Sequence, residues 1–245
     1  MVDMVMDERS YPTALAAGPG AGDTGVRTGI AWVLDILKRQ GGQVLVYAPG
    51  KQNIERHTLL SAFSQQRGVA VGTWRRSDFG WSGGPVLAAW PDRAKLGEIA
   101  DDSRTTALCV VPWSPGEVDG WVEAHHPELL PGAEVSEAEG DTLHPVVAEG
   151  LKTLTASVNH GNHLTGALDR RDAVAVLRAL REAGYRWSPD RMYSWALMHE
   201  WPAPGAERLR ALAKDFEDGK RPQLKGGNPL RPDIVDMWRV EAGEQ

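Results

Sequence analysis

Short apolar runs alternate with segments of helical spacing along the first half of the chain. The apolar runs are Val44 to Ala48, Val69 to Trp74, Pro85 to Trp90 and Thr105 to Val111. Between them, apolar residues recur at helical intervals, as Leu59, Leu60 and Phe63 do. Strands that are apolar on both faces and alternate with helices are typical of a parallel sheet covered on two sides. The pattern predicts an α/β domain over residues 28–126, built on a small, mostly parallel three-layer sheet.

The segment between the second and third apolar runs breaks this rhythm. It contains Arg75, Arg76 and several glycines, and it is too short for a crossover helix. A loop is expected there, and antiparallel pairing of the two runs is one alternative, because parallel strands need a long connection. The strand order stays open.

Helical patterns continue after an acidic connector at residues 127–143. Residues 144–220 are predicted to form a helical domain of three or four helices, because their apolar residues keep helical spacing. Proline marks the expected helix starts and glycine the expected helix ends, at Pro145, Pro189, Pro204, Gly184 and Gly219.

The two ends of the chain carry no such periodicity. Residues 1–27 are predicted to be a flexible leader, since the run at 16–22 consists only of alanine, glycine and proline. Residues 221–245 are predicted to be an extended basic segment followed by a tail.

Composition excludes several classes of protein. Hydrophobic residues make up 42% and charged residues 24% of the chain, which is ordinary for a folded domain. No apolar stretch approaches the roughly 18 residues of a membrane helix, and acidic residues near Met1 argue against a secretory signal. The single cysteine, Cys109, cannot build a disulfide framework. We expect a cytoplasmic protein without a membrane partner.

The net charge of −6 is unevenly distributed. Residues 166–232 carry 13 Lys and Arg against 9 Asp and Glu, a balance of +4, whereas the preceding part of the chain is acidic. Interleaved acids favour ordinary solvated helix faces, and nucleic-acid contact is the alternative. That contact would be made by basic residues of the helices and of the following segment, namely Arg171, Arg178, Lys220, Arg221 and Lys225.

No complete catalytic, metal or cofactor motif is present. The segment Pro49 to Asn53 follows a predicted strand but lacks the glycine and hydroxyl spacing of a phosphate loop. His160 and His163 lie on a glycine-containing turn without further ligands at a set spacing, so a metal site is not predicted. We predict no catalytic residue and no cofactor.

Tryptophan is the unusual feature of the composition, with ten Trp against three Phe and four Tyr. Three predicted strands end at or near a tryptophan, and ligands of parallel sheets bind outside the carboxyl ends of the strands. Rings and cations gathered there would suit a nucleotide or a nucleic-acid strand. The alternative is that the rings are core residues. The candidate ligand-binding residues are Lys51, Gln52, Trp74, Arg75, Arg76, Trp90, Asp92 and Trp113.

The succession of strands and helices from Val44 to Trp113 is similar in rhythm to one lobe of RecA-like helicase cores. The nucleotide-contacting motifs of that family are missing from this segment. The resemblance therefore implies a type of fold, and no functional residue is transferred from it.

The function predicted from these features is that of a non-catalytic binding or regulatory protein, with a nucleotide or nucleic acid as possible ligand. One alternative is an enzyme of unrecognised type that uses the same edge, with Asp78, Asp92 or a histidine as acid or base. Another is a structural subunit of a larger assembly, in which the tryptophans contact a protein partner.

Overall fold

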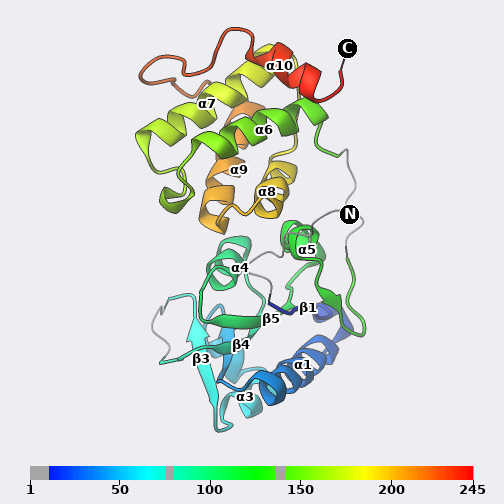
Figure 1. The fold of residues 1–245 in the computed structure, drawn as a ribbon. Helices are drawn as coiled ribbons and strands as arrows, with labels where there is room; N and C mark the ends of the chain where they lie inside the picture. Colours follow the sequence, from blue (N-terminus) through cyan, green and yellow to red (C-terminus); the bar gives the residue numbers. More distant parts are fainter. Residues whose placement is uncertain (1–10, 76–79, 136–141, 245) are drawn as a thin grey trace, which may run out of the picture. The chain divides into compact units, whose positions relative to one another are not determined.

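The computed structural model describes residues 11–75, 80–135 and 142–244 (Figure 1). The chain divides into two compact units, Met1–Glu137 and Ala138–Gln245. The first is an α/β unit and the second is helical, as the pattern predicted. Each unit is described by itself below.

The amino-terminal unit contains a six-stranded sheet in the order β3-β2-β4-β5-β1-β6. All its pairings are parallel, so the antiparallel alternative is wrong. The two strands in question do not pair at all, because β2 lies between β3 and β4. The strands are β1 (Thr13–Leu15), β2 (Val44–Ala48), β3 (Val69–Thr73), β4 (Gly84–Ala89), β5 (Thr105–Val111) and β6 (Glu128–Leu129).

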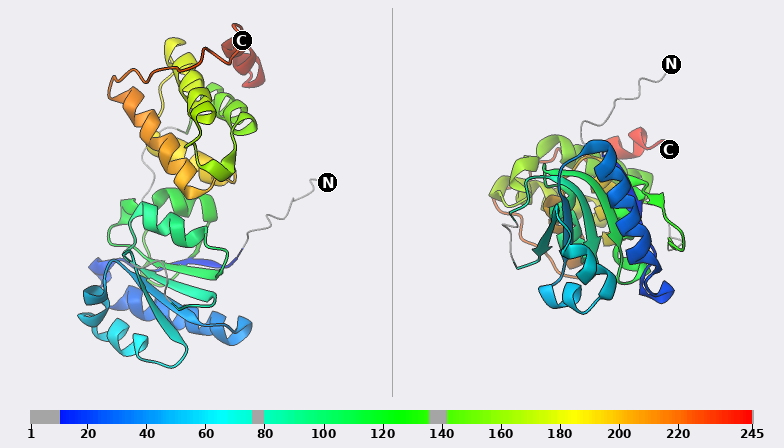
Figure 2. Two further views of the ribbon diagram at one scale, coloured as in Figure 1. Left: turned by 90° about the vertical axis from the view of Figure 1, so that its left-hand side faces the viewer. Right: turned by 90° about the horizontal axis from the view of Figure 1, so that it is seen from below.

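Helices cover both faces of this sheet (Figures 1 and 2). One face packs against Val33 of α1 and Phe63 of α3, and the other against Leu96 of α4 and Trp121 of α5. The predicted three-layer α/β architecture is thereby confirmed. The helices of this unit are α1 (Thr24–Gln40), α2 (Lys51–Glu55), α3 (Thr58–Ser64), α4 (Arg93–Ala100) and α5 (Asp119–His125).

The predicted flexible leader is wrong for residues 11–27. Residues Thr13–Leu15 form β1 inside the sheet, between β5 and β6, and α1 begins at Thr24. Hydrogen bonding to a strand on each side stabilises a segment that is too short to show a strand pattern. Residues 1–10 lie outside the described part of the chain.

The predicted connector, residues 127–143, also contributes to the sheet. Its residues Glu128 and Leu129 pair with Ala14 and Leu15 as β6. The indole Nε1 of Trp32 on α1 donates to Glu128 Oε2 at 2.9 Å, which links this edge strand to the covering helix.

The helical unit has one hydrophobic core shared by its helices. A fifth helix, α10, forms within residues 221–245, so the predicted extended tail is wrong from Ile234 onward. Trp238 of α10 is 1% exposed, and its Nε1 donates to Thr153 Oγ1 at 2.8 Å. The helices are α6 (Pro145–Ser157), α7 (Ala167–Glu182), α8 (Pro189–Met198), α9 (Ala203–Glu217) and α10 (Ile234–Glu241).

Two glycines bring α1 unusually close to the sheet. A Cβ atom on Gly25 would lie 1.8 Å from the carbonyl oxygen of Ala17, and one on Gly29 would lie 2.8 Å from Leu87 Cδ1. The first contact is with backbone, which cannot swing away as a side chain can. The start of α1 and the end of β1 are therefore held in one arrangement.

Gly25→Ala is expected to destabilise the amino-terminal unit by roughly 1–3 kcal/mol or more, because overpacking forces the backbone to shift. Urea unfolding gives the loss, and hydrogen–deuterium exchange of the strand peptides assigns the transition to this unit. Gly20→Ala is the matched control, since a Cβ there meets nothing within 4 Å. Equal stability of the two variants would contradict the assigned contact.

Trp238→Ala is expected to destabilise the helical unit by roughly 3–5 kcal/mol, the usual cost of emptying a large buried site. The measurement is urea unfolding with exchange of the α6 and α10 peptides. Val240→Ala on the same helix, at a side chain 77% exposed, should change stability by no more than about 0.5 kcal/mol. A Trp238→Ala protein as stable as this control would show that α10 does not close the core.

Candidate functional site

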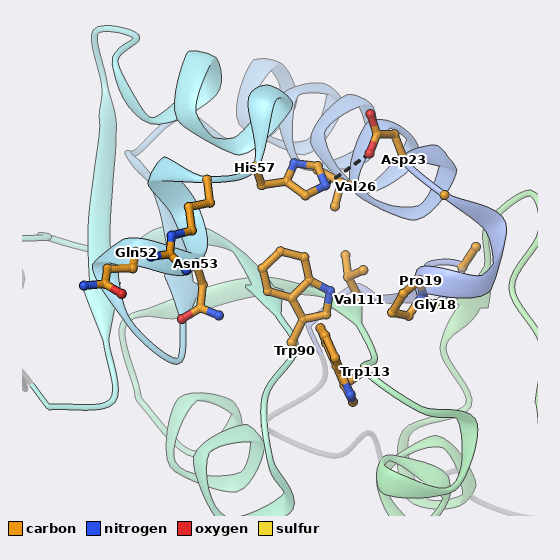
Figure 3. Close-up of a pocket in the computed structure, with 13 residues that line it drawn as sticks. Gly18, Pro19, Asp23, Val26, Gln52, Asn53, His57, Trp90, Val111 and Trp113 are labelled. Carbon is orange, nitrogen blue, oxygen red and sulfur yellow. Dashed lines mark ion pairs between the residues drawn. The ribbon is translucent and has the colours of Figure 1, made fainter.

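A pocket of about 440 Å³ opens at the carboxyl ends of β1, β2, β4 and β5 (Figure 3). Its walls come from the loop and helix start after β1, from α2 and the following turn, and from residues just after β4 and β5. The volume lies within the range of roughly 300–1,000 Å³ that small-molecule sites occupy. The lining residues are Ala17, Gly18, Pro19, Gly22, Asp23, Val26, Gln52, Asn53, Arg56, His57, Trp90, Val111 and Trp113.

The strand order explains why the chain leaves a crevice there. From β2 the chain continues to β3 on one side, whereas from β4, the neighbour of β2, it continues to β5 on the other side. Connections that diverge in this way leave space above the strand ends, and open α/β sheets bind ligands at such points. The pocket therefore follows from the topology.

Two tryptophans and a histidine form the aromatic wall. The rings of Trp90 and Trp113 meet edge to face, with centroids 6.1 Å apart and an interplanar angle of 88°. The ring of His57 lies 5.6 Å from that of Trp90 on its other side, so Trp90 stands between the other two rings (Figure 3). Trp113 is 59% exposed, which leaves ring surface open for a ligand.

Trp90 adopts a strained backbone conformation. Its φ is 57°, in the left-handed region, where a bulky side chain costs of order 1–3 kcal/mol. Its N–H donates to the Val111 carbonyl at 2.7 Å, so the residue is still held by the neighbouring strand as the chain turns away. Such strain persists where surrounding contacts impose it, and it is concentrated at functional sites.

An ion pair joins two walls of the pocket. Asp23 Oδ1, at the start of α1, lies 3.3 Å from His57 Nε2, at the start of α3. His57 Nδ1 accepts the Leu60 N–H at 3.5 Å and so caps α3. An accepting Nδ1 leaves Nε2 to carry a ring proton, which it can donate to Asp23.

Polar side chains at and just after α2 complete the lining. Gln52 and Asn53 bring amide groups that can donate and accept hydrogen bonds. Arg56 is exposed, and no acidic partner is placed within ion-pair distance of it among the described residues. The pocket thus combines flat apolar rings with amides, one carboxylate and one guanidinium.

The structure brings three of the predicted ligand-binding residues, Gln52, Trp90 and Trp113, into this pocket. Lys51 is adjacent to it, but its Nζ lies 3.1 Å from Glu55 on the exposed side of α2. Asp92 is instead the N-cap of α4, where its carboxylate accepts the Lys95 N–H at 2.8 Å.

Trp74 does not join the other two indoles. It packs against the core on the α4 and α5 face of the sheet, whereas Trp90 packs against the α1 and α3 face. The expectation that one cleft would gather all three rings is wrong, because sequence position does not fix the direction in which a ring turns after its strand ends. Arg75 is exposed outside the pocket, and Arg76 lies outside the described residues.

Sequence reasoning missed the loop of residues 17–23, together with Asn53, Arg56 and His57. The signal for the loop is the run Gly-Pro-Gly-Ala-Gly at residues 18–22, which the sequence analysis assigns to the predicted flexible leader. It now stands between a strand and a helix, where glycines let a backbone approach a ligand. The pairing of His57 with Asp23 has no sequence signal, since it depends on how α1 and α3 pack.

Three of the five residues predicted to contact nucleic acid interact with other groups of the helical unit. Arg171 pairs with Asp172 at 2.7 Å, Lys220 pairs with Asp215 at 2.6 Å, and Arg178 donates to the Pro222 carbonyl at 2.7 Å. The other two, Arg221 and Lys225, are exposed. Nucleic-acid contact at this place stays a prediction.

Two kinds of group suited to covalent or metal chemistry can be checked in the described part of the chain. Cys109 is buried in β5, and burial raises the pKa of its thiol far above the ordinary value, with a smaller contribution from Glu128. Within residues 11–75, 80–135 and 142–244, no three His, Cys, Asp or Glu side chains are placed to hold a metal ion. Asp78, named above for the enzyme alternative, lies outside the described residues.

The described helices include none that is long and apolar enough to span a membrane.

Comparison with known proteins adds one finding. Residues 143–239, most of the helical unit, match a family model described as a domain of unknown function (DUF1889). Neither the curated proteins nor the solved structures compared with the chain gave a match. The helical unit therefore contains a region similar to DUF1889.

Proposed function

We propose that this protein is a non-catalytic binding protein whose amino-terminal unit holds a nucleobase-bearing ligand, a nucleotide or a nucleic-acid strand, in the pocket at the strand ends. The observation that carries the proposal is the aromatic wall of Trp90 and Trp113. One ring is fixed by a strained backbone and the other is largely exposed. A planar ring stacked there would bury apolar surface that water now contacts.

The amides of the pocket suit the edge of a base. Asn53 and Gln52 each offer a carbonyl oxygen and an amino group, which match the alternating acceptors and donors of nucleobase edges. Stacking on a flat side chain and hydrogen bonding along the edge are the two means by which proteins hold unpaired bases.

Two groups that could carry out chemistry, a carboxylate and a thiol, are placed where they do not face the pocket, which supports a binding role. Asp92, one of the candidate acids or bases of the enzyme alternative, is engaged in capping α4. Cys109 is fully buried.

Intrinsic tryptophan fluorescence, titrated with nucleosides, nucleotides and short single-stranded DNA, tests the proposal. Saturable quenching is expected, and Trp113→Ala should weaken binding by roughly 1–3 kcal/mol, the usual contribution of one stacking side chain. Because Trp113 is largely exposed, the variant should still fold.

Leu129→Ala is the matched control, since this side chain is also exposed, at 54%, and does not line the pocket. It should bind as the unchanged protein does. Failure of all compounds to quench the fluorescence, or equal affinities of the Trp113→Ala and Leu129→Ala proteins, would remove the proposed site.

A further inference from the structure

The loop between β1 and α1 matches two of the four fixed positions of a phosphate-binding loop, and a third position carries the opposite charge. Such loops read Gly, any four residues, Gly, Lys and then Ser or Thr, between a strand and a helix. Residues 17–24 read Ala-Gly-Pro-Gly-Ala-Gly-Asp-Thr, so Gly22 and Thr24 fit the pattern. Ala17 replaces the first glycine, and Asp23 replaces the lysine. The position fits too, because the loop joins parallel strand β1 to α1.

The exchange of lysine for aspartate changes which ligands the pocket can hold. In a phosphate loop the lysine reaches the β and γ phosphates. A carboxylate at the same place repels those groups, and this repulsion is stronger near a protein surface than in bulk water. Arg56 is the opposing cation among the described lining residues, and it lies on another wall, after α2.

The carboxylate is held at the rim of the pocket. Its oxygen lies 3.3 Å from His57 Nε2, and the other nitrogen of that ring accepts the Leu60 N–H. This contact holds the Asp23 side chain in place at the pocket. The Asp23 side chain is still 56% exposed, so it can accept a second hydrogen bond from a ligand.

We propose that Asp23 makes this pocket selective for an uncharged nucleoside over the corresponding nucleoside triphosphate. The inference rests on the proposed function and names the ligand class for the same site. A nucleoside offers a base to Trp90 and Trp113 and hydroxyl groups to the Asp23 carboxylate, an acceptor that also serves ribose hydroxyls in dinucleotide sites. A triphosphate offers the same base but places its negative charges against Asp23.

Isothermal titration of the full chain with adenosine, guanosine, cytidine and uridine, and with their 5′-triphosphates, tests the selectivity. The unchanged protein is expected to bind its preferred nucleoside at least about tenfold more tightly than that nucleoside's triphosphate, because like charges are brought together in the second complex. Asp23→Lys should reverse the order, since it restores the lysine of the phosphate-loop pattern. Asp23→Asn keeps the shape of the side chain but removes its charge. It should lower the ratio of nucleoside affinity to triphosphate affinity at least about threefold.

Asp35→Lys is the matched control for overall charge. Asp35 lies on the same helix, its side chain is 63% exposed, and it does not line the pocket. This variant should keep the preference of the unchanged protein.

The outcomes separate the two proposals. Triphosphate binding by the unchanged protein that equals or exceeds nucleoside binding overturns the selectivity and leaves the nucleobase pocket standing. The selectivity is also overturned if Asp23→Asn leaves the ratio of nucleoside to triphosphate affinity unchanged. This second test holds even if the Asp23→Lys protein fails to fold. Absence of binding by every compound to every variant overturns the proposed function, and this inference with it.

Discussion

The close contact between α1 and the sheet is the constraint on which the amino-terminal unit depends. Gly25 lets the first turn of α1 rest on the Ala17 carbonyl, and Gly29 lets the helix settle over Leu87 and Cys109. This contact fixes where β1 ends and where the helix begins. The glycine-rich loop between them is short, so its path along the pocket is set by the same contact. The pocket is thus a product of helix packing as much as of the loop sequence.

The fold was predictable where the apolar runs are long. The strands β2 to β5 each have five or more residues and were expected from their composition. The strands β1 and β6 have three and two residues, too few to display a pattern. They become strands because β5 offers hydrogen-bonding groups to β1, and β1 then offers its own to β6. These two strands can therefore be recognised only once the neighbouring strands of the sheet are in place.

The site was predictable to the level of the sheet edge. The rule that ligands bind at the carboxyl ends of parallel strands pointed to Gln52, Trp90 and Trp113, and these three residues line one pocket at that edge. It could not tell that Trp74 turns to the other face, since both rings leave their strands after similar sequences. Because β1 was not predicted, the glycine-rich loop that follows it was not recognised as a strand-to-helix connection, and Asp23 was missed with it. The same limit applied to α10, where the buried ring of Trp238 makes part of the predicted tail a member of the helical core.

The imidazole of His57 makes two contacts. Its Nδ1 accepts a hydrogen bond from the first turn of α3, and its Nε2 contacts Asp23, 34 positions earlier in the chain. Because one ring makes both contacts, the position of Asp23 at the pocket is tied to the position of the first turn of α3. A substitution of His57 would therefore remove the cap of a helix and the partner of a lining carboxylate together.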